Sequence, residues 1–132
     1  MMDKGIFKAY NVRGRYPQEI DEEIVFDITR SLGRYFKPGK IVVGHDSRLS
    51  SPSLYQAVIR GFMIHGLRFK ILKVGITTTP MFYFLVNEFR AQGGVMVTAS
   101  HNPKNYNGLK VVGKKAKMIG GKEVLKIMNL KS

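Results

Sequence analysis

The sequence contains no cysteine, and this absence limits the chemistry that the chain can perform. Disulfides and thiolate metal sites are excluded, so any nucleophile must be an oxygen or a nitrogen atom. No apolar run approaches the roughly 20 residues that a membrane helix needs. The N-terminal stretch MMDKGIFKAYNVRGRYP also lacks the continuous apolar segment of a signal peptide. We therefore expect a cytoplasmic protein without a membrane partner.

Acidic residues are scarce: the chain has 9 Asp and Glu against 22 Lys and Arg, which gives a net charge of +13. Such a charge attracts polyanions, phosphorylated metabolites or an acidic partner surface. Nucleic-acid-binding proteins often share this composition. Here, however, most of the six Tyr and eight Phe fall on apolar helix faces instead of forming a stacking platform among lysines. Nucleic-acid binding is therefore disfavoured, and a solvated basic surface with no dedicated partner is the simpler alternative.

The 132 residues are 44% apolar, which suits a single domain, 1–132, with its own core. Apolar strand-like runs alternate with stretches of helical periodicity. The pattern predicts strands at 6–10, 41–44, 69–74, 95–97 and 109–112, and helices at 21–36, 51–63, 79–89 and 122–130. This alternation predicts an α/β fold, a three-layer α/β/α domain with a mixed, mainly parallel sheet.

Polar loops follow three of the predicted strands, with the sequences NVRGR, HDSR and TASHNP. In open α/β sheets ligands bind where such loops leave the carboxyl ends of the strands. All three loops carry groups that bind anions. We therefore expect one site where the three loops meet.

The loop after residue 97 contains Ser100 followed by His101. Neighbouring residues on an extended backbone point to opposite sides, and the G-x-S-x-G pattern of many hydrolases is missing, so a serine hydrolase is disfavoured. Phosphoryl transfer suits the loop better, because a phosphoserine needs surrounding donors such as His101, Arg13, Arg48 and backbone N–H groups. We expect Asn107-Gly108 to form a turn that directs Lys110 back toward Ser100. Lys110 would then exchange a proton with a sugar hydroxyl or act as a point charge on a phosphate.

Plainer explanations exist for each of these residues. Ser100 suits the cap of a turn, and Asn102-Pro103 is an ordinary turn sequence. Arg13 suits a solvated loop, and Asp46 and Arg48 suit an ion pair at a helix entry. The three histidines are too scattered in the sequence for a metal site.

Four motifs resemble those of the alpha-D-phosphohexomutases, the family of phosphoglucomutase and phosphomannomutase. TASHNP followed by YNGLK resembles the segment that carries the active-site serine. FKAYNVRG is similar to F-R-x-Y-D-I-R-G, GHDSRLSS to G-x-D-x-R-x-S-S, and GITTTP to G-x-x-x-T-P. The motifs occur in the family's order across residues 7–110, which makes the resemblance specific.

The resemblance implies a role for each site residue. Ser100 would be phosphorylated and would donate its phosphoryl group to a hexose phosphate, through a bisphosphate intermediate that reorients. His101 would lie beside the reacting hydroxyl, and Lys110 would be the general acid or base. The implied substrate and phosphate ligands are Tyr10, Arg13, Asn102 and Arg48. Mg²⁺ would be held by the phosphate on Ser100 and by aspartates of another domain, and a hexose 1,6-bisphosphate would act as activator.

Two departures from the family pattern matter. Asn11 stands where the family has an aspartate that would orient Arg13. The second departure is length: the family's enzymes have four domains, and the chain resembles the first alone. The D-G-D-G-D-R, G-E-x-S-G-H and R-x-S-G-T motifs of the other domains do not occur in it.

We therefore expect domains II–IV to be missing or to reside on a separate chain, and the isolated chain to be inactive. The alternative is a stand-alone, non-catalytic interaction or phosphosugar-sensing domain. Phosphomannomutase, phosphoglucomutase and a bifunctional activity all remain open, as does the oligomeric state.

Overall fold

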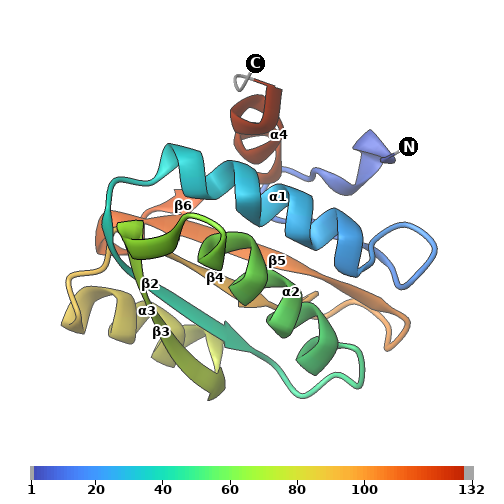
Figure 1. The fold of residues 1–132 in the computed structure, drawn as a ribbon. Helices are drawn as coiled ribbons and strands as arrows, with labels where there is room; N and C mark the ends of the chain where they lie inside the picture. Colours follow the sequence, from blue (N-terminus) through green and yellow to red (C-terminus); the bar gives the residue numbers. More distant parts are fainter. Residues whose placement is uncertain (1, 130–132) are drawn as a thin grey trace.

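A six-stranded mixed sheet forms the middle layer of the structure, a computed structural model that describes residues 2–129 (Figure 1). The strands lie in the order β1-β5-β4-β2-β3, and β6 pairs with β5. They are β1 (Val12–Arg15), β2 (Gly39–His45), β3 (Phe69–Ile76), β4 (Gly93–Val97), β5 (Tyr106–Gly113) and β6 (Met118–Ile119). The helices are α1 (Glu22–Tyr35), α2 (Ser51–Met63), α3 (Thr79–Glu88) and α4 (Gly121–Asn129). Short 3-10 turns occupy Lys4–Ile6, Gly66–Arg68 and Lys114–Ala116.

The sheet has a parallel half and an antiparallel half. β2 pairs in parallel with β3 and β4, whereas β5 runs antiparallel to β4, β1 and β6. α1 and α2 cover one face and α3 lies on the other (Figure 1). The predicted α/β/α architecture with a mixed sheet is confirmed.

Alternate residues of the central strands supply two cores. Ile41 and Val43 of β2 join the larger core beneath α1 and α2, whereas Val42 joins the smaller core beneath α3. A strand that is buried on both faces reads as a continuous apolar run, which explains the sequence IVV. α3 packs against β2, β4 and the turn 114–116, so the β5 and β1 half of its face is less covered.

The helices begin where their capping residues predict. The Asp21 carboxylate accepts a hydrogen bond from the Ile24 N–H at 2.9 Å, and Glu22 and Glu23 occupy the first turn of α1. The Thr78 hydroxyl accepts one from the Met81 N–H at 3.2 Å at the start of α3. All four predicted helices are confirmed, although the predicted last residue of α4, residue 130, lies outside the described part of the chain.

The strand predicted at 6–10 is wrong. Ile6 ends a 3-10 turn, Phe7 makes only an isolated bridge to Val12, and β1 forms within the segment that was expected to be a loop. Ile6 and Phe7 are consecutive and both buried, at 2% and 1% exposure, so they do not alternate as strand residues do. They close the end of the larger core instead.

The turn predicted at Asn107-Gly108 is also wrong, because both residues lie inside β5. The buried Asn107 amide donates to the hydroxyls of Ser50 and Ser51, at 2.7 and 3.0 Å. A Cβ atom on Gly108 would lie 2.0 Å from the carbonyl oxygen of Val12. The glycine is therefore required by the close approach of β1.

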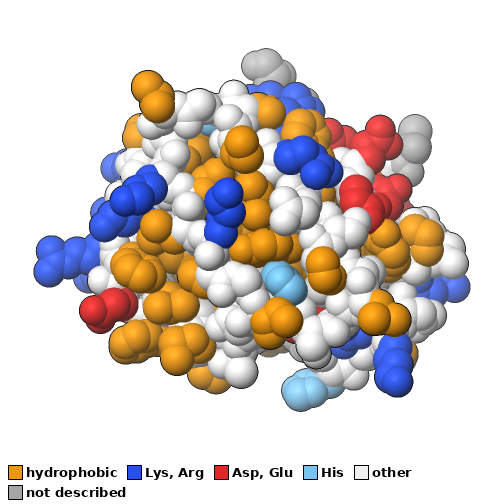
Figure 2. All heavy atoms as spheres, turned by 60° about the horizontal axis from the view of Figure 1, so that its bottom comes forward, with side chains coloured by type: hydrophobic (Ala, Val, Ile, Leu, Met, Phe, Trp, Pro, Cys, Tyr) orange, Lys and Arg blue, Asp and Glu red, His pale blue; other side chains and the backbone are white. Residues whose placement is uncertain are grey.

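Hydrophobic side chains gather on the outer side of α3 and the end of β3 (Figure 2). Ile76, Met81 and Phe84 are 71%, 49% and 56% exposed. Within residues 2–129, no helix combines the length and the apolar character that crossing a bilayer demands.

Candidate active site

A cavity of about 860 Å³ opens at the carboxyl ends of the parallel strands. Its walls come from the loops that follow β2, β3 and β4, and from the side chain of Lys110 on β5. Ser100, His101 and Lys110 all line it, so the structure brings together three of the residues expected at the site. Thr77, Thr78 and Thr79 line the opposite wall.

Ser100 is exposed at the tip of the loop 98–105 in a left-handed conformation, with a φ of 55°. Its N–H donates to the Thr98 hydroxyl at 3.0 Å, and the Asn102 N–H donates to the Ala99 carbonyl at 3.1 Å. A non-glycine residue rarely adopts this conformation, which persists only where the surroundings determine it. The two hydrogen bonds form a tight turn that holds the hydroxyl out toward the cavity.

The side chain of Arg48 holds this loop in place. Its Nη2 donates to the carbonyl oxygens of Ser100 and Asn102 at 2.9 and 2.8 Å, and its Nη1 donates to those of Pro103 and Tyr106 at 2.7 and 3.1 Å. Its Nε donates to the Asp46 carboxylate at 3.3 Å. A guanidinium has five N–H groups, and all five are used. These hydrogen bonds position the loop 98–105, the serine loop, and the phosphate contact expected of Arg48 stays a prediction.

Asp46 completes this brace. Its carboxylate accepts hydrogen bonds from the Arg48 backbone N–H at 3.0 Å and from the Ser51 hydroxyl, in addition to the Arg48 side chain. The Asp46–Arg48 ion pair that the plainer explanation proposed is therefore present. His45 lies behind it, buried at 7% exposure, with its ring 4.5 Å from that of Tyr55 and its Nδ1 2.7 Å from the Asp46 carbonyl oxygen.

Strand register, and not a turn, places Lys110 and Arg13. Lys110 lies opposite Met96 of β4 on the face of the sheet that carries α3, and Arg13 of β1 lies opposite Gly108. Since side chains alternate along a strand, Arg13 and Lys110 share that face as diagonal neighbours, with backbone positions about 7–8 Å apart. Arg13 is half-buried. It belongs to the sheet instead of the loop in which it was expected.

Two other expected ligands, Tyr10 and Asn102, do not line the cavity. Tyr10 is 68% exposed and is not part of the cavity wall, and Asn102 contributes its carbonyl oxygen to Arg48. Their contacts with substrate stay predictions. Asn11 is buried at 4% exposure, and its side-chain oxygen has no hydrogen-bond partner among the described residues.

A second set of hydrogen bonds supports the outer end of the serine loop. The Tyr16 N–H donates to the Asn105 carbonyl at 2.8 Å, while the Tyr16 hydroxyl and the Ser53 hydroxyl both donate to the Glu22 carboxylate. Burial by itself would raise the pKa of Glu22, but the bonds from Ser53 and Tyr16 hold it below its ordinary value. The bond to Glu22 raises the pKa of Tyr16. These contacts tie the loop to α1 and α2.

The described residues do not by themselves fit the Mg²⁺ that the resemblance implies. Within residues 2–129 no three or more Asp, Glu or His side chains group as metal ligands would. Asp46 is the acid that lines the cavity, and both of its oxygens already accept hydrogen bonds. A hard cation such as Mg²⁺ needs near-octahedral oxygen coordination.

Residues 4–131 match the family model described as phosphoglucomutase/phosphomannomutase, alpha/beta/alpha domain I. Proteins named phosphomannomutase from Klebsiella pneumoniae and Escherichia coli are each 48% identical over 115 residues, which is 87% of this chain. A solved phosphoglucomutase/phosphomannomutase family protein from Burkholderia thailandensis superimposes with a TM-score of 0.85, at 31% identity over 98% of this chain.

The match covers 72% of the Klebsiella protein, 25% of the E. coli protein and 30% of the Burkholderia structure. The chain thus spans about a quarter of the length of the E. coli relative. The motifs, the loop geometry and these matches agree with the resemblance seen in the sequence. The chain belongs to the phosphoglucomutase/phosphomannomutase family and matches its alpha/beta/alpha domain I.

Proposed function

We propose that Ser100 carries a phosphoryl group in the interconversion of hexose 1-phosphate and hexose 6-phosphate, as part of a phosphomannomutase or phosphoglucomutase. The observation that carries this proposal is the shared cavity of Ser100, His101 and Lys110 at the carboxyl edge of the sheet. The names of the relatives support the reaction, and the position of the loop supports the role of the serine.

The proposed transfer balances in two steps. The bond between phosphorus and the Ser100 oxygen breaks as a sugar hydroxyl oxygen bonds to phosphorus, and the hydroxyl proton passes to Lys110. After the bisphosphate has reoriented, its other phosphoryl group is transferred to the Ser100 oxygen. The bond between that phosphorus and the sugar oxygen breaks, and Lys110 gives the proton back to this oxygen. His101 and Arg13 supply positive charge or hydrogen bonds beside the phosphate, and Arg48 holds the loop in place. Such preorganised donors stabilise a transferring phosphoryl group.

This chain would contribute one part of the full site. Ser100, through its phosphate, would give Mg²⁺ one ligand, and acids outside the described residues would supply the others. The ion would offset charge on the phosphoryl group. The half-covered face at β5 and β1 and the exposed Ile76, Met81 and Phe84 support a docked partner, which we propose to be domains II–IV. The excess of positive charge would suit the acidic groups around that metal.

We expect the isolated chain to turn over hexose phosphate negligibly. Gripping both ends of a substrate makes transfer effectively intramolecular, an advantage worth about 7–11 kcal/mol. Adding domains II–IV as a separate polypeptide should restore measurable mutase activity. Full turnover by the 132-residue chain would contradict this division of labour.

Intact mass after incubation with glucose 1,6-bisphosphate tests the role of Ser100. We expect a gain of one phosphate that maps to Ser100 and disappears in Ser100→Ala. Ser47→Ala is the matched control, because Ser47 lines the same cavity and its loss should leave the gain unchanged. A gain that persists in Ser100→Ala would refute the proposal. A gain with no turnover after domains II–IV are added would favour the non-catalytic sensing role.

A further inference from the structure

We propose that a second cavity, at the edge of the sheet opposite Ser100, binds a small organic anion composed of a flat ring and a phosphate group. β2 and β4 begin at this edge, at Gly39 and Gly93, and β5 ends here at Gly113. The length of these strands separates the cavity from Ser100 by roughly 20 Å. The inference therefore does not depend on the proposed function of Ser100.

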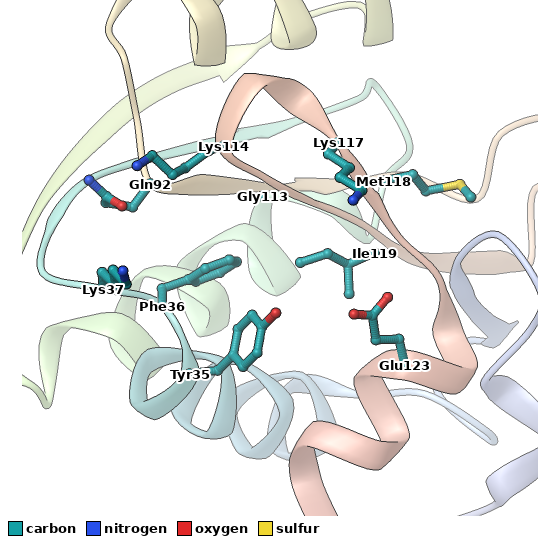
Figure 3. A pocket seen from close by; sticks show the side chains of 10 residues that line it. All are labelled: Tyr35, Phe36, Lys37, Gln92, Gly113, Lys114, Lys117, Met118, Ile119 and Glu123. Atoms are coloured by element: carbon teal, nitrogen blue, oxygen red, sulfur yellow. The ribbon is translucent and has the colours of Figure 1, made fainter.

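The walls of this cavity come from four separate parts of the chain (Figure 3). Tyr35 and Phe36 close one side at the end of α1, Gln92 precedes β4, and the β5–β6 hairpin and the start of α4 form the rest. The volume is about 510 Å³, which lies within the range of about 300–1,000 Å³ typical of small-molecule sites. The space therefore suits a small ligand.

Aromatic and aliphatic side chains form the floor. Phe36 and Ile119 are buried at 3% and 6% exposure, and the half-exposed Tyr35 ring meets Phe36 edge to face at a centroid distance of 5.6 Å. Such rings bury large apolar area and favour contact with another ring. This floor accounts for the flat apolar part of the ligand.

Three lysines account for the anionic part. Lys37, Lys114 and Lys117 line the cavity against a single acid, Glu123, and among residues 2–129 none of the four takes part in an ion pair. Lysine commonly binds phosphate groups and does so as a point charge. Three lysines around the cavity against one carboxylate give it an excess of positive charge, which favours an anionic ligand.

The hairpin turn holds two of these lysines apart in a fixed arrangement. The Lys117 N–H donates to the Lys114 carbonyl at 3.2 Å, and the Gly113 N–H donates to the Lys117 carbonyl at 2.8 Å. Between them, Lys115 and Ala116 are left-handed, with φ of 61° and 58°. Ala116 packs on the core beneath α3 and anchors the turn. Lys114 and Lys117 therefore flank the cavity, whereas Lys115 is not part of its wall.

The opposite side of the cavity offers hydrogen-bonding groups for the ring. Figure 3 shows the Tyr35 hydroxyl and the Glu123 carboxylate together on this side, away from Lys114. A ring substituent that donates a hydrogen bond would meet the carboxylate there. The charge pattern thus orients the ligand, with its phosphate toward the hairpin and its ring over Tyr35 and Phe36.

Titration of the ¹⁵N-labelled chain, followed by amide chemical shifts, tests this site. The probes are phenyl phosphate, inorganic phosphate for the charge alone, and phenol for the ring alone. We expect phenyl phosphate to shift the amides of Gln92, Gly113 and Lys117 and to bind at least tenfold more tightly than either fragment. Ser100→Ala should leave this binding unchanged, whether or not Ser100 is a phosphate carrier.

Matched variants distinguish a specific binding site from the general attraction of anions to a basic protein. Lys114→Ala/Lys117→Ala should weaken phenyl phosphate binding at least tenfold, whereas Lys70→Ala/Lys73→Ala removes the same charge from two exposed positions of β3 and should leave it unchanged. Tyr35→Ala should weaken phenyl phosphate more than inorganic phosphate. Equal affinities for phenyl phosphate and inorganic phosphate, equal losses in the two lysine pairs, or shifts confined to residues 98–105 would each overturn the proposal.

Discussion

Two tight loops at opposite edges of the sheet both contain left-handed residues other than glycine, but they are held in different ways. The serine loop has one such residue, Ser100, and is tied to Arg48 by four hydrogen bonds from a guanidinium 50 or more positions away. The hairpin turn has two, Lys115 and Ala116, and is closed by two local backbone hydrogen bonds and the packing of Ala116. A long-range brace makes the serine loop part of the core structure, whereas the hairpin turn is mainly a local element.

Removing the brace should have the largest effect. We expect Arg48→Ala to lower the free energy of unfolding by about 3 kcal/mol, because it leaves Asp46 unpaired and four carbonyl groups without their donor. Displacement of Ser100 should also abolish phosphate incorporation. Denaturant unfolding and intact mass measure the two effects.

Arg68→Ala is the control for Arg48, since Arg68 also bridges carbonyl oxygens, those of Gly33 and Phe36 at 3.1 and 2.7 Å. It should lower stability without changing phosphate incorporation. If the two variants behaved alike in the phosphate assay, the serine loop would not depend on its brace.

β5 connects both regions, and two of its glycines differ in whether they tolerate a side chain. We expect Gly108→Ala to lower the free energy of unfolding by about 2–3 kcal/mol, because the new Cβ would meet the Val12 carbonyl oxygen at 2.0 Å and force β1 aside. In Gly113→Ala the new Cβ would have its nearest neighbour at 3.7 Å, so the free energy of unfolding should change by less than about 0.5 kcal/mol. Thermal unfolding compares them, and an equal cost would mean that β1 does not lie against Gly108.

The stability that the hydrogen bonds to Glu22 give to the protein should depend on pH. Since the folded-state pKa of Glu22 lies below its ordinary value of 4.5, its contribution to stability is present above that pH and is lost as the pH falls through the lowered pKa. We expect Glu22→Gln to cost about 1 kcal/mol at pH 7 and progressively less below pH 4.5. Urea unfolding at several pH values measures this. A cost that is independent of pH would argue against the ionised carboxylate as acceptor.

Relief of backbone strain should give the smallest effect, and it should have the same sign in both loops. We expect Lys115→Gly and Ser100→Gly each to raise the free energy of unfolding by about 1 kcal/mol, because glycine adopts a positive φ without penalty. Only Ser100→Gly should lose phosphate incorporation. Lys117→Gly, at a φ of −71°, is the control and should not stabilise the chain.

The sequence by itself determined the alternation of helices and strands, the capping residues and the four motifs that indicate the family. These features are local, because periodicity and capping act within a few residues. The same local rules misplaced the first strand, since consecutive Ile6 and Phe7 fill the core without forming one. They also misread Asn107-Gly108, whose asparagine bonds across to α2 and whose glycine admits β1.

Only the tertiary structure decided the role of Arg48 and the placement of Arg13 and Lys110. Nothing in the segment HDSR shows that its arginine would meet four carbonyl oxygens more than 50 positions along the chain. The shared face of Arg13 and Lys110 likewise follows from the register of β1 on β5. Both depend on which distant segments pack together, and that is fixed by the collapse of the whole core around the sheet.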